Sequence, residues 1–155
     1  MSFRIAGLDP ASFRPLFDLD EAALAARNAR RAVADAPYAA PCRVSLEDAE
    51  PGEELMLLSY EHQPAASPYR SAGPIFVRRA AIEPWDRVGE IPPAIARRPI
   101  SARGYDRDGL MLDGELVDGA DVASLIERWF ENPTVDVIHL HYARRGCFAA
   151  SVVRV

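Results

Sequence analysis

Short stretches in which hydrophobic and polar residues alternate, or in which apolar residues run unbroken, recur along the chain and are typical of β-strands. The clearest apolar run, residues 54–60, follows the turn residues Pro51 and Gly52, which predicts a buried central strand. Further strands are expected over residues 3–5, 31–36, 74–78, 100–106, 109–116, 135–142 and 147–155. Residues 107–108 and 143–146 then form two hairpin loops.

One segment, residues 119–131, instead has the 3.6-residue period of an amphipathic helix. Its apolar stripe consists of Val122, Leu125, Ile126, Trp129 and Phe130. Shorter helices are expected over residues 10–17 and 20–30. This order of elements predicts an α+β protein, a single domain over residues 1–155 with a mostly antiparallel β-sheet and a few helices packed on it.

The composition narrows the class of protein. The chain has 155 residues, of which 49% are hydrophobic, and a formal net charge of −5, values that suit one globular domain. The acidic balance argues against nucleic acid and against anionic membranes as partners, and it says nothing about oligomeric state. No apolar run approaches the roughly 18 residues of a membrane span, and the first residues do not resemble a signal peptide. We therefore expect a cytoplasmic protein with Cys42 and Cys147 reduced.

All 18 basic side chains are arginines, and the sequence has no lysine. Schiff-base chemistry on a lysine and phosphate loops with their lysine are therefore excluded. Any fixed positive charge in an anion site has to come from arginine.

The sequence has three histidines, and two of them, His139 and His141, are two residues apart on an expected strand. Their side chains then share one face of the sheet, where they form a hydrogen-bonded structural pair, a polar catalytic site or part of a metal site. A cupin-like metal motif requires a glutamate shortly after such a pair, and residues 143–145 are Ala-Arg-Arg. We therefore assign no metal ligand and no cofactor. A four-residue hairpin loop pairs His141 with Phe148 and favours His62 as the companion of the pair.

A second group of polar residues lies in the loop between the strands at 54–60 and 74–78. It contains Tyr69 and Arg70, and Arg70 together with Arg78 or Arg79 could hold a carboxylate or phosphate. The alternative is a surface loop in which Arg70 pairs with Glu61 or Asp106.

Several segments taken together resemble the DUF1203 family of small bacterial proteins. They are residues 41–49, residues 60–64, residues 67–70, residues 73–78, and the Ile-His-Leu-His and Gly-Cys pieces within residues 138–147. The resemblance implies a bacterial origin and a single domain, and it implies no reaction type.

The sequence supports two hypotheses about function. In the first, one polar cleft binds a small anionic molecule through Arg43, Tyr69, Arg70, Arg78 and Arg144, and His62, His139 and His141 act as general acids or bases. In the second, the protein is a non-catalytic structural or interaction module, and its histidines and arginines are satisfied internally. Convergence of His62, Arg70 and His141 in space would favour the first hypothesis.

Overall fold

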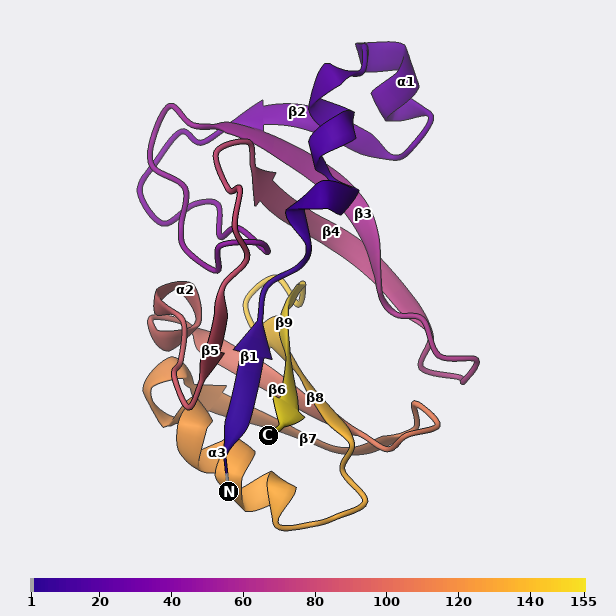
Figure 1. Ribbon diagram of the computed structural model, residues 1–155, viewed down its shortest axis with the longest axis vertical. Coiled ribbons are helices and arrows are strands. Elements are labelled where there is room, and N and C mark those ends of the chain that lie inside the picture. The colour runs from indigo at the N-terminus through magenta and orange to yellow at the C-terminus, as the bar shows by residue number, and fades with distance from the viewer. Residues whose placement is uncertain (1) are drawn as a thin grey trace.

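The computed structural model describes residues 2–155 and contains two antiparallel sheets (Figure 1). The six-stranded sheet has the order β5-β1-β9-β8-β6-β7, and its strands are β1 (Phe3–Ala6), β5 (Asp86–Val88), β6 (Pro99–Tyr105), β7 (Met111–Asp118), β8 (Val137–Tyr142) and β9 (Phe148–Arg154). The three-stranded sheet has the order β2-β3-β4, with β2 (Ala29–Val33), β3 (Glu54–Gln63) and β4 (Ser71–Arg78). The predicted α+β class with antiparallel pairing is confirmed.

The helices are short, and the longest of them packs against the six-stranded sheet (Figure 1). They are η1 (Pro10–Ser12), η2 (Arg14–Asp18), α1 (Glu21–Ala25), α2 (Pro93–Ala96), η3 (Gly119–Asp121) and α3 (Val122–Phe130). The five stripe residues of α3 are buried and pack in one cluster with residues of the six-stranded sheet such as Ile100, Ile138 and Val152. Among residues 2–155 no helix has the length and apolar character that a transmembrane segment needs.

The helix expected over residues 20–30 is wrong in its length, because α1 ends at Ala25. Asn28 has a φ of 52°, a left-handed conformation that turns the chain, and β2 starts at the next residue. Pairing of β2 with β3, in which Arg31 lies opposite Met56, outweighs the helix propensity of this alanine-rich segment. The strand expected over residues 31–36 is therefore shifted to 29–33.

Strand β3 is longer than expected and carries His62 within it. Its pairing with β4 shifts register between Tyr60 and Gln63, so a β-bulge contains His62. A bulge bends its strand and re-aims the side chains in it. The sequence predicts no strand over residues 83–93, but this segment contains the short strand β5, which pairs with β1.

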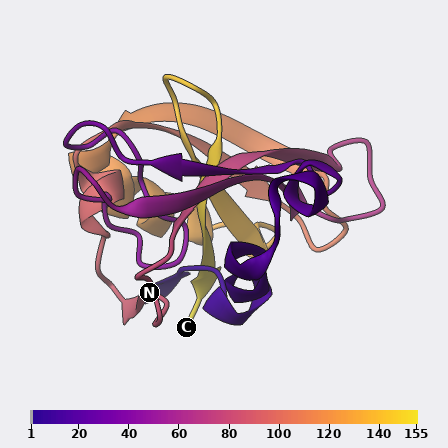
Figure 2. The ribbon, with the colours of Figure 1, turned by 90° about the horizontal axis from the view of Figure 1, so that it is seen from above.

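The two sheets lie against each other with their strands crossing, as β3 and β9 show when the molecule is seen from above (Figure 2). The hairpin of β3 and β4 also touches the hairpin of β6 and β7, where the Ser67 hydroxyl donates to the Gly109 carbonyl at 2.8 Å. Gly109 has a φ of 79°, and a Cβ there would meet the Ala65 Cβ at 2.3 Å. The glycine therefore permits both the turn and the close contact, and this contact helps to hold the end of β3 over the six-stranded sheet.

Candidate functional site

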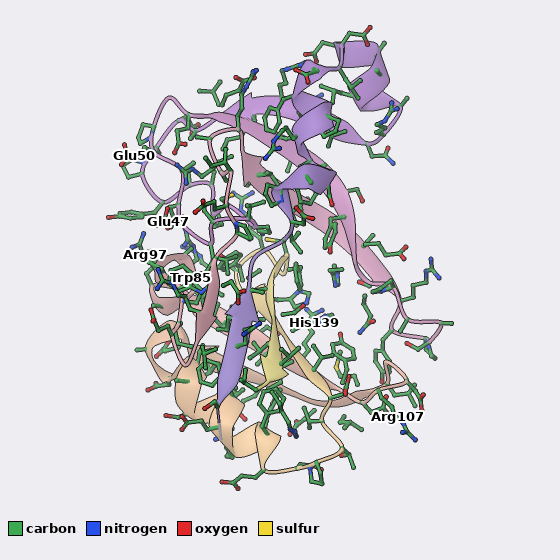
Figure 3. The ribbon with its side chains drawn as sticks, in the orientation of Figure 1. Glu47, Glu50, Trp85, Arg97, Arg107 and His139 are labelled. Carbon is green, nitrogen blue, oxygen red and sulfur yellow. The ribbon has the colours of Figure 1, made fainter. Side chains whose placement is uncertain are left out.

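The three histidines of the chain converge where the end of β3 meets β8. His139 and His141 come from β8, and His62 approaches them from the three-stranded sheet. The ring centroid of His62 is 4.9 Å from that of His141 and 6.2 Å from that of His139. Figure 3 shows His139 on the side of the six-stranded sheet that faces β3 and β4. The structure thus brings together the three residues that the sequence analysis singled out as catalytic candidates.

Each of these rings has a buried nitrogen without a hydrogen-bond partner among the described residues: Nδ1 of His62, Nδ1 of His139 and Nε2 of His141. One potential ligand atom from each histidine lies within 4.8 Å of the others. Buried polar atoms are nearly always paired, so three unpaired nitrogens in one place are unusual.

The other ring nitrogens orient the cluster. Nδ1 of His141 is 2.9 Å from the Gly146 carbonyl oxygen, which can only accept, so this nitrogen carries the proton. In the neutral ring, Nε2 of His141 then has a free lone pair, the form that binds a metal ion. Nε2 of His62 lies 3.0 Å from the Ser71 hydroxyl, which holds that ring in place.

Burial favours the neutral form of all three rings. It lowers the pKa of His139 to about 4, with smaller contributions from the neighbouring His62 and the positive charge of Arg103. Burial also lowers the pKa of His141 to about 3, against the opposing effect of the Gly146 carbonyl. The pKa of His62 is lowered by burial and by Arg103. Neutral imidazoles are metal ligands, whereas a general acid has to carry a proton near neutral pH.

Phe148 on β9 forms one wall of the cluster. Its ring stacks on His62 at 5.4 Å with an interplanar angle of 6°, and it meets His139 and His141 edge-on. Phe148 lies opposite His141 in the register of β8 and β9, as the four-residue hairpin loop predicted. The neighbouring Cys147 contacts Arg43 instead and is not part of the cluster.

Arg103, which the sequence analysis did not select, contributes the positive charge of this site. It lies on β6 directly opposite His139, so the two side chains share a face of the sheet. Arg103 makes no ion pair within residues 2–155. The Tyr105 ring, two residues along β6, is 5.0 Å from His139 and 6.2 Å from Tyr69. Side chains two residues apart in a strand point to the same side, so the expected strand at 100–106 already places Arg103 and Tyr105 on one face.

Two of the predicted ligand-binding arginines are engaged elsewhere. Arg70 forms an exposed ion pair with Glu61 at 3.0 Å, one of the two pairings considered for a surface loop. Arg78 pairs with Glu53 at 2.8 Å. His62 and His141 therefore converge as the anion hypothesis expected, while Arg70 points to a carboxylate of its own hairpin.

The other two, Arg43 and Arg144, line a separate cavity with Tyr142 and Cys147. Arg43 is 1% exposed and donates through Nε to the Phe148 carbonyl at 2.7 Å. The single cleft expected from the sequence is thus divided into a histidine cluster and an arginine-lined cavity.

Three neutral imidazoles suit a divalent transition-metal ion. Zinc binds histidine nitrogens at about 2.0–2.1 Å, so two ligands of a tetrahedral site are about 3.3 Å apart. Because the widest pair of ligand atoms here is separated by no more than 4.8 Å, the rings have to close by about 1.5 Å at most. Three protein ligands leave a fourth position open for water or substrate, the pattern of catalytic zinc sites.

Comparison with known proteins supports the family resemblance. The family model described as "Protein of unknown function (DUF1203)" matches residues 39–154. No curated protein and no solved structure gives a significant match. The matched range contains all three histidines and every arginine considered as a ligand residue, and it leaves out β1, η1, η2, α1 and β2. The chain therefore belongs to the DUF1203 family, as its sequence motifs predicted.

Proposed function

We propose that His62, His139 and His141 bind one divalent transition-metal ion, with zinc the best fit to three imidazoles, and that this centre acts on a small anionic molecule. The observation that carries the proposal is the convergence of three histidines from two different sheets, each with a buried ring nitrogen that has no hydrogen-bond partner among residues 2–155. Each such nitrogen costs about 1–3 kcal/mol if it is left unpaired, and one metal ion would satisfy all three.

The non-catalytic alternative accounts for the arginines better than for the histidines. Arg70, Arg78 and Arg98 have carboxylate partners, as internally satisfied residues should. His139 has no hydrogen bond to either ring nitrogen among the described residues. A purely structural role leaves that buried polar ring unexplained.

The surroundings favour an anion at the open position of the metal. Three neutral ligands leave the full double charge on the ion, which lowers the pKa of a bound water to about 7. Arg103 adds a second positive charge on the same face of the sheet. A small anionic substrate held by Arg103 next to an activated water suits a hydrolysis or hydration reaction. In this proposal the histidines are ligands, in place of the general acids or bases expected from the sequence.

Metal binding is the direct test. After treatment with a chelator and removal of the chelator, the protein is titrated with zinc in competition with a chromophoric indicator. We expect one zinc per chain, and we expect His62→Ala, His139→Ala and His141→Ala each to lower the affinity by at least about 100-fold.

The His62→Ala variant is the most informative, because His62 comes from the other sheet. Arg70→Ala and Cys147→Ser are the matched controls and should bind zinc like the unaltered protein. Circular dichroism checks that each variant is folded. Zinc binding that is absent, or that survives all three histidine substitutions, would overturn the proposal.

A further inference from the structure

A cavity of about 720 Å³ opens beside the end of β8 and the hairpin loop that follows it. Its volume lies within the range of small-molecule sites, which is about 300–1,000 Å³. Its lining includes five arginines, namely Arg43, Arg97, Arg98, Arg144 and Arg145. Tyr38, Phe76 and Tyr142 add aromatic surface, and Asp35 is the one acidic residue in the lining.

The carboxylates of the chain neutralise only part of this positive charge. Asp48 pairs with both Arg97 and Arg98, with N–O distances of 2.7 and 2.5 Å. Asp35 forms no ion pair with any described residue. Within residues 2–155 the other three guanidinium groups, those of Arg43, Arg144 and Arg145, have no carboxylate partner. The cavity therefore has an excess of fixed positive charge, in a protein whose net charge is −5.

Arg43 is the most telling of the three, because it is only 1% exposed. Its guanidinium donates to the carbonyls of Phe148 and Pro41 and to the Cys147 sulfur, all of them groups of the chain other than carboxylates. These bonds use three of its five N–H donors. A buried charge without a counter-charge is unfavourable, so an anion in the cavity would supply what the chain does not.

Tyr142 provides a second, independent indication of a ligand. Its side chain is enclosed by two guanidinium groups, with Arg43 at 4.9 Å and Arg98 at 5.2 Å from the ring centroid. The residue is 5% exposed, and its buried hydroxyl has no hydrogen-bond partner in the part of the chain that the structure describes. Burial raises the pKa of Tyr142 to about 12, so the hydroxyl keeps its proton and remains a donor.

From this geometry we infer that the cavity is a binding site for a phosphate monoester of a small organic molecule. Arg144, Arg145 and the remaining donors of Arg43 hold the phosphate together with the Tyr142 hydroxyl, and the organic part contacts Tyr38 and Phe76. Three guanidinium groups without carboxylates suit a doubly charged phosphate better than a singly charged carboxylate. The site is separate from the histidine cluster and does not depend on a metal ion there.

Isothermal titration calorimetry of the chelator-treated protein with phenyl phosphate tests this inference. Inorganic phosphate measures the contribution of the phosphate group alone, and benzoate at the same ionic strength tests a carboxylate on the same ring. We expect phenyl phosphate to bind at least 10-fold more tightly than benzoate. Equal affinities, or no binding of phenyl phosphate, would overturn the inference.

Variants locate the site. Arg144→Ala/Arg145→Ala should weaken phenyl phosphate binding by at least 10-fold, and Tyr142→Phe, which removes only the hydroxyl, by about 5-fold. Arg107→Ala/Arg27→Ala changes the net charge equally at exposed arginines elsewhere and should leave binding unchanged. If the two double variants behave alike, the binding is non-specific. If His139→Ala abolishes binding, the phosphate occupies the histidine cluster, and the cavity assignment is wrong.

Cys147 gives a readout inside the cavity, because Cys42 is fully buried and Cys147 is partly exposed. Phenyl phosphate should slow alkylation of Cys147 by iodoacetamide at least 3-fold in the unaltered protein. It should not do so in the Arg144→Ala/Arg145→Ala variant. Unchanged alkylation of Cys147 at a saturating concentration of phenyl phosphate would place the ligand outside the cavity.

Discussion

Burial has opposite consequences for the basic groups of the histidine cluster and of the arginine-lined cavity. In the cluster, burial keeps His139 and His141 in their neutral form, which leaves lone pairs suited to a cation. In the cavity, Arg43 is equally buried, but a guanidinium cannot give up its proton at accessible pH. It stays charged, which is the reason for proposing an anion in this cavity. Under the two proposals, buried basic groups in one small protein bind ligands of opposite charge, according to whether the group can lose its proton.

The two regions share one structural element, the hairpin loop at residues 143–146. Its Gly146 carbonyl accepts from Nδ1 of His141, and its Arg144 and Arg145 side chains line the cavity. Gly146 has a φ of 77°, a conformation that favours glycine and that this turn requires. One loop therefore orients a ring in the cluster and supplies charge to the cavity.

Acidification of the metal-free protein should cause the greatest loss of stability. The folded-state pKa values of His139 and His141 are about 4 and 3, whereas the ordinary value is 6.5. Below pH 6.5, and down to these folded-state values, the two rings therefore bind protons in the unfolded chain but not in the folded chain. Their contribution to stability is complete above pH 6.5 and declines as the pH falls. Between pH 7 and 4.5 we expect a loss on the order of 4–5 kcal/mol in the free energy of unfolding.

Urea denaturation at several pH values measures this loss. The matched control is His139→Asn/His141→Asn, in which the other groups facing the rings, His62 and Arg103, are retained. Its stability should fall much less over the same range. Parallel curves for the two proteins would show that these rings are not the source of the pH dependence.

Removal of the Phe148 ring, which forms one wall of the histidine cluster, should cause the next largest loss of stability. Phe148 is 2% exposed and contacts all three histidines, so Phe148→Ala should lower the free energy of unfolding by about 3–5 kcal/mol. Phe76, in the cavity lining, is only half-buried, and Phe76→Ala should cost less than about 2 kcal/mol. Urea denaturation at pH 7.5 compares the two variants, and equal losses would contradict the view that the cluster is the more tightly packed region.

A smaller effect is expected from the hydroxyl that orients His62. Ser71→Ala removes the partner of Nε2 and should lower zinc affinity by about 10-fold, with a cost in stability of about 1 kcal/mol. Ser67→Ala, which removes a hydroxyl bonded to the Gly109 carbonyl in the same hairpin, is the control. If Ser67→Ala weakens zinc binding as much as Ser71→Ala, the effect comes from the hairpin as a whole.

The smallest effect is expected at Arg70, which belongs to neither region. Its ion pair with Glu61 is exposed, so Arg70→Ala should change the free energy of unfolding by less than about 0.5 kcal/mol. Zinc titration and phenyl phosphate calorimetry should both match the unaltered protein. A clear loss of affinity for zinc or for phenyl phosphate in Arg70→Ala would instead support the anion-binding role that the sequence suggested for Arg70.

Much of the fold was predictable because it rests on local patterns. The 3.6-residue period over 119–131 identified α3 and its buried face, and the four-residue loop at 143–146 identified the pairing of His141 with Phe148. Segment 20–30 was less predictable, because pairing with β3 replaced the helix that its alanines favour. The roles of the charged residues were the least predictable. Arg70 and Arg78 suit an anion site by residue type and position, but in the fold they form ion pairs with Glu61 and Glu53.

Composition and short-range periodicity are enough to establish an α+β protein without lysine, with His139 and His141 on one face of a strand. Three further features are visible only in the folded protein: a bulge in β3 carries His62 to that pair, Arg103 on β6 lies opposite His139, and Arg43 is buried beside a different cavity. These outcomes depend on how two sheets pack and on the registers of their strands. Such contacts join residues far apart in the chain, and no local pattern specifies them.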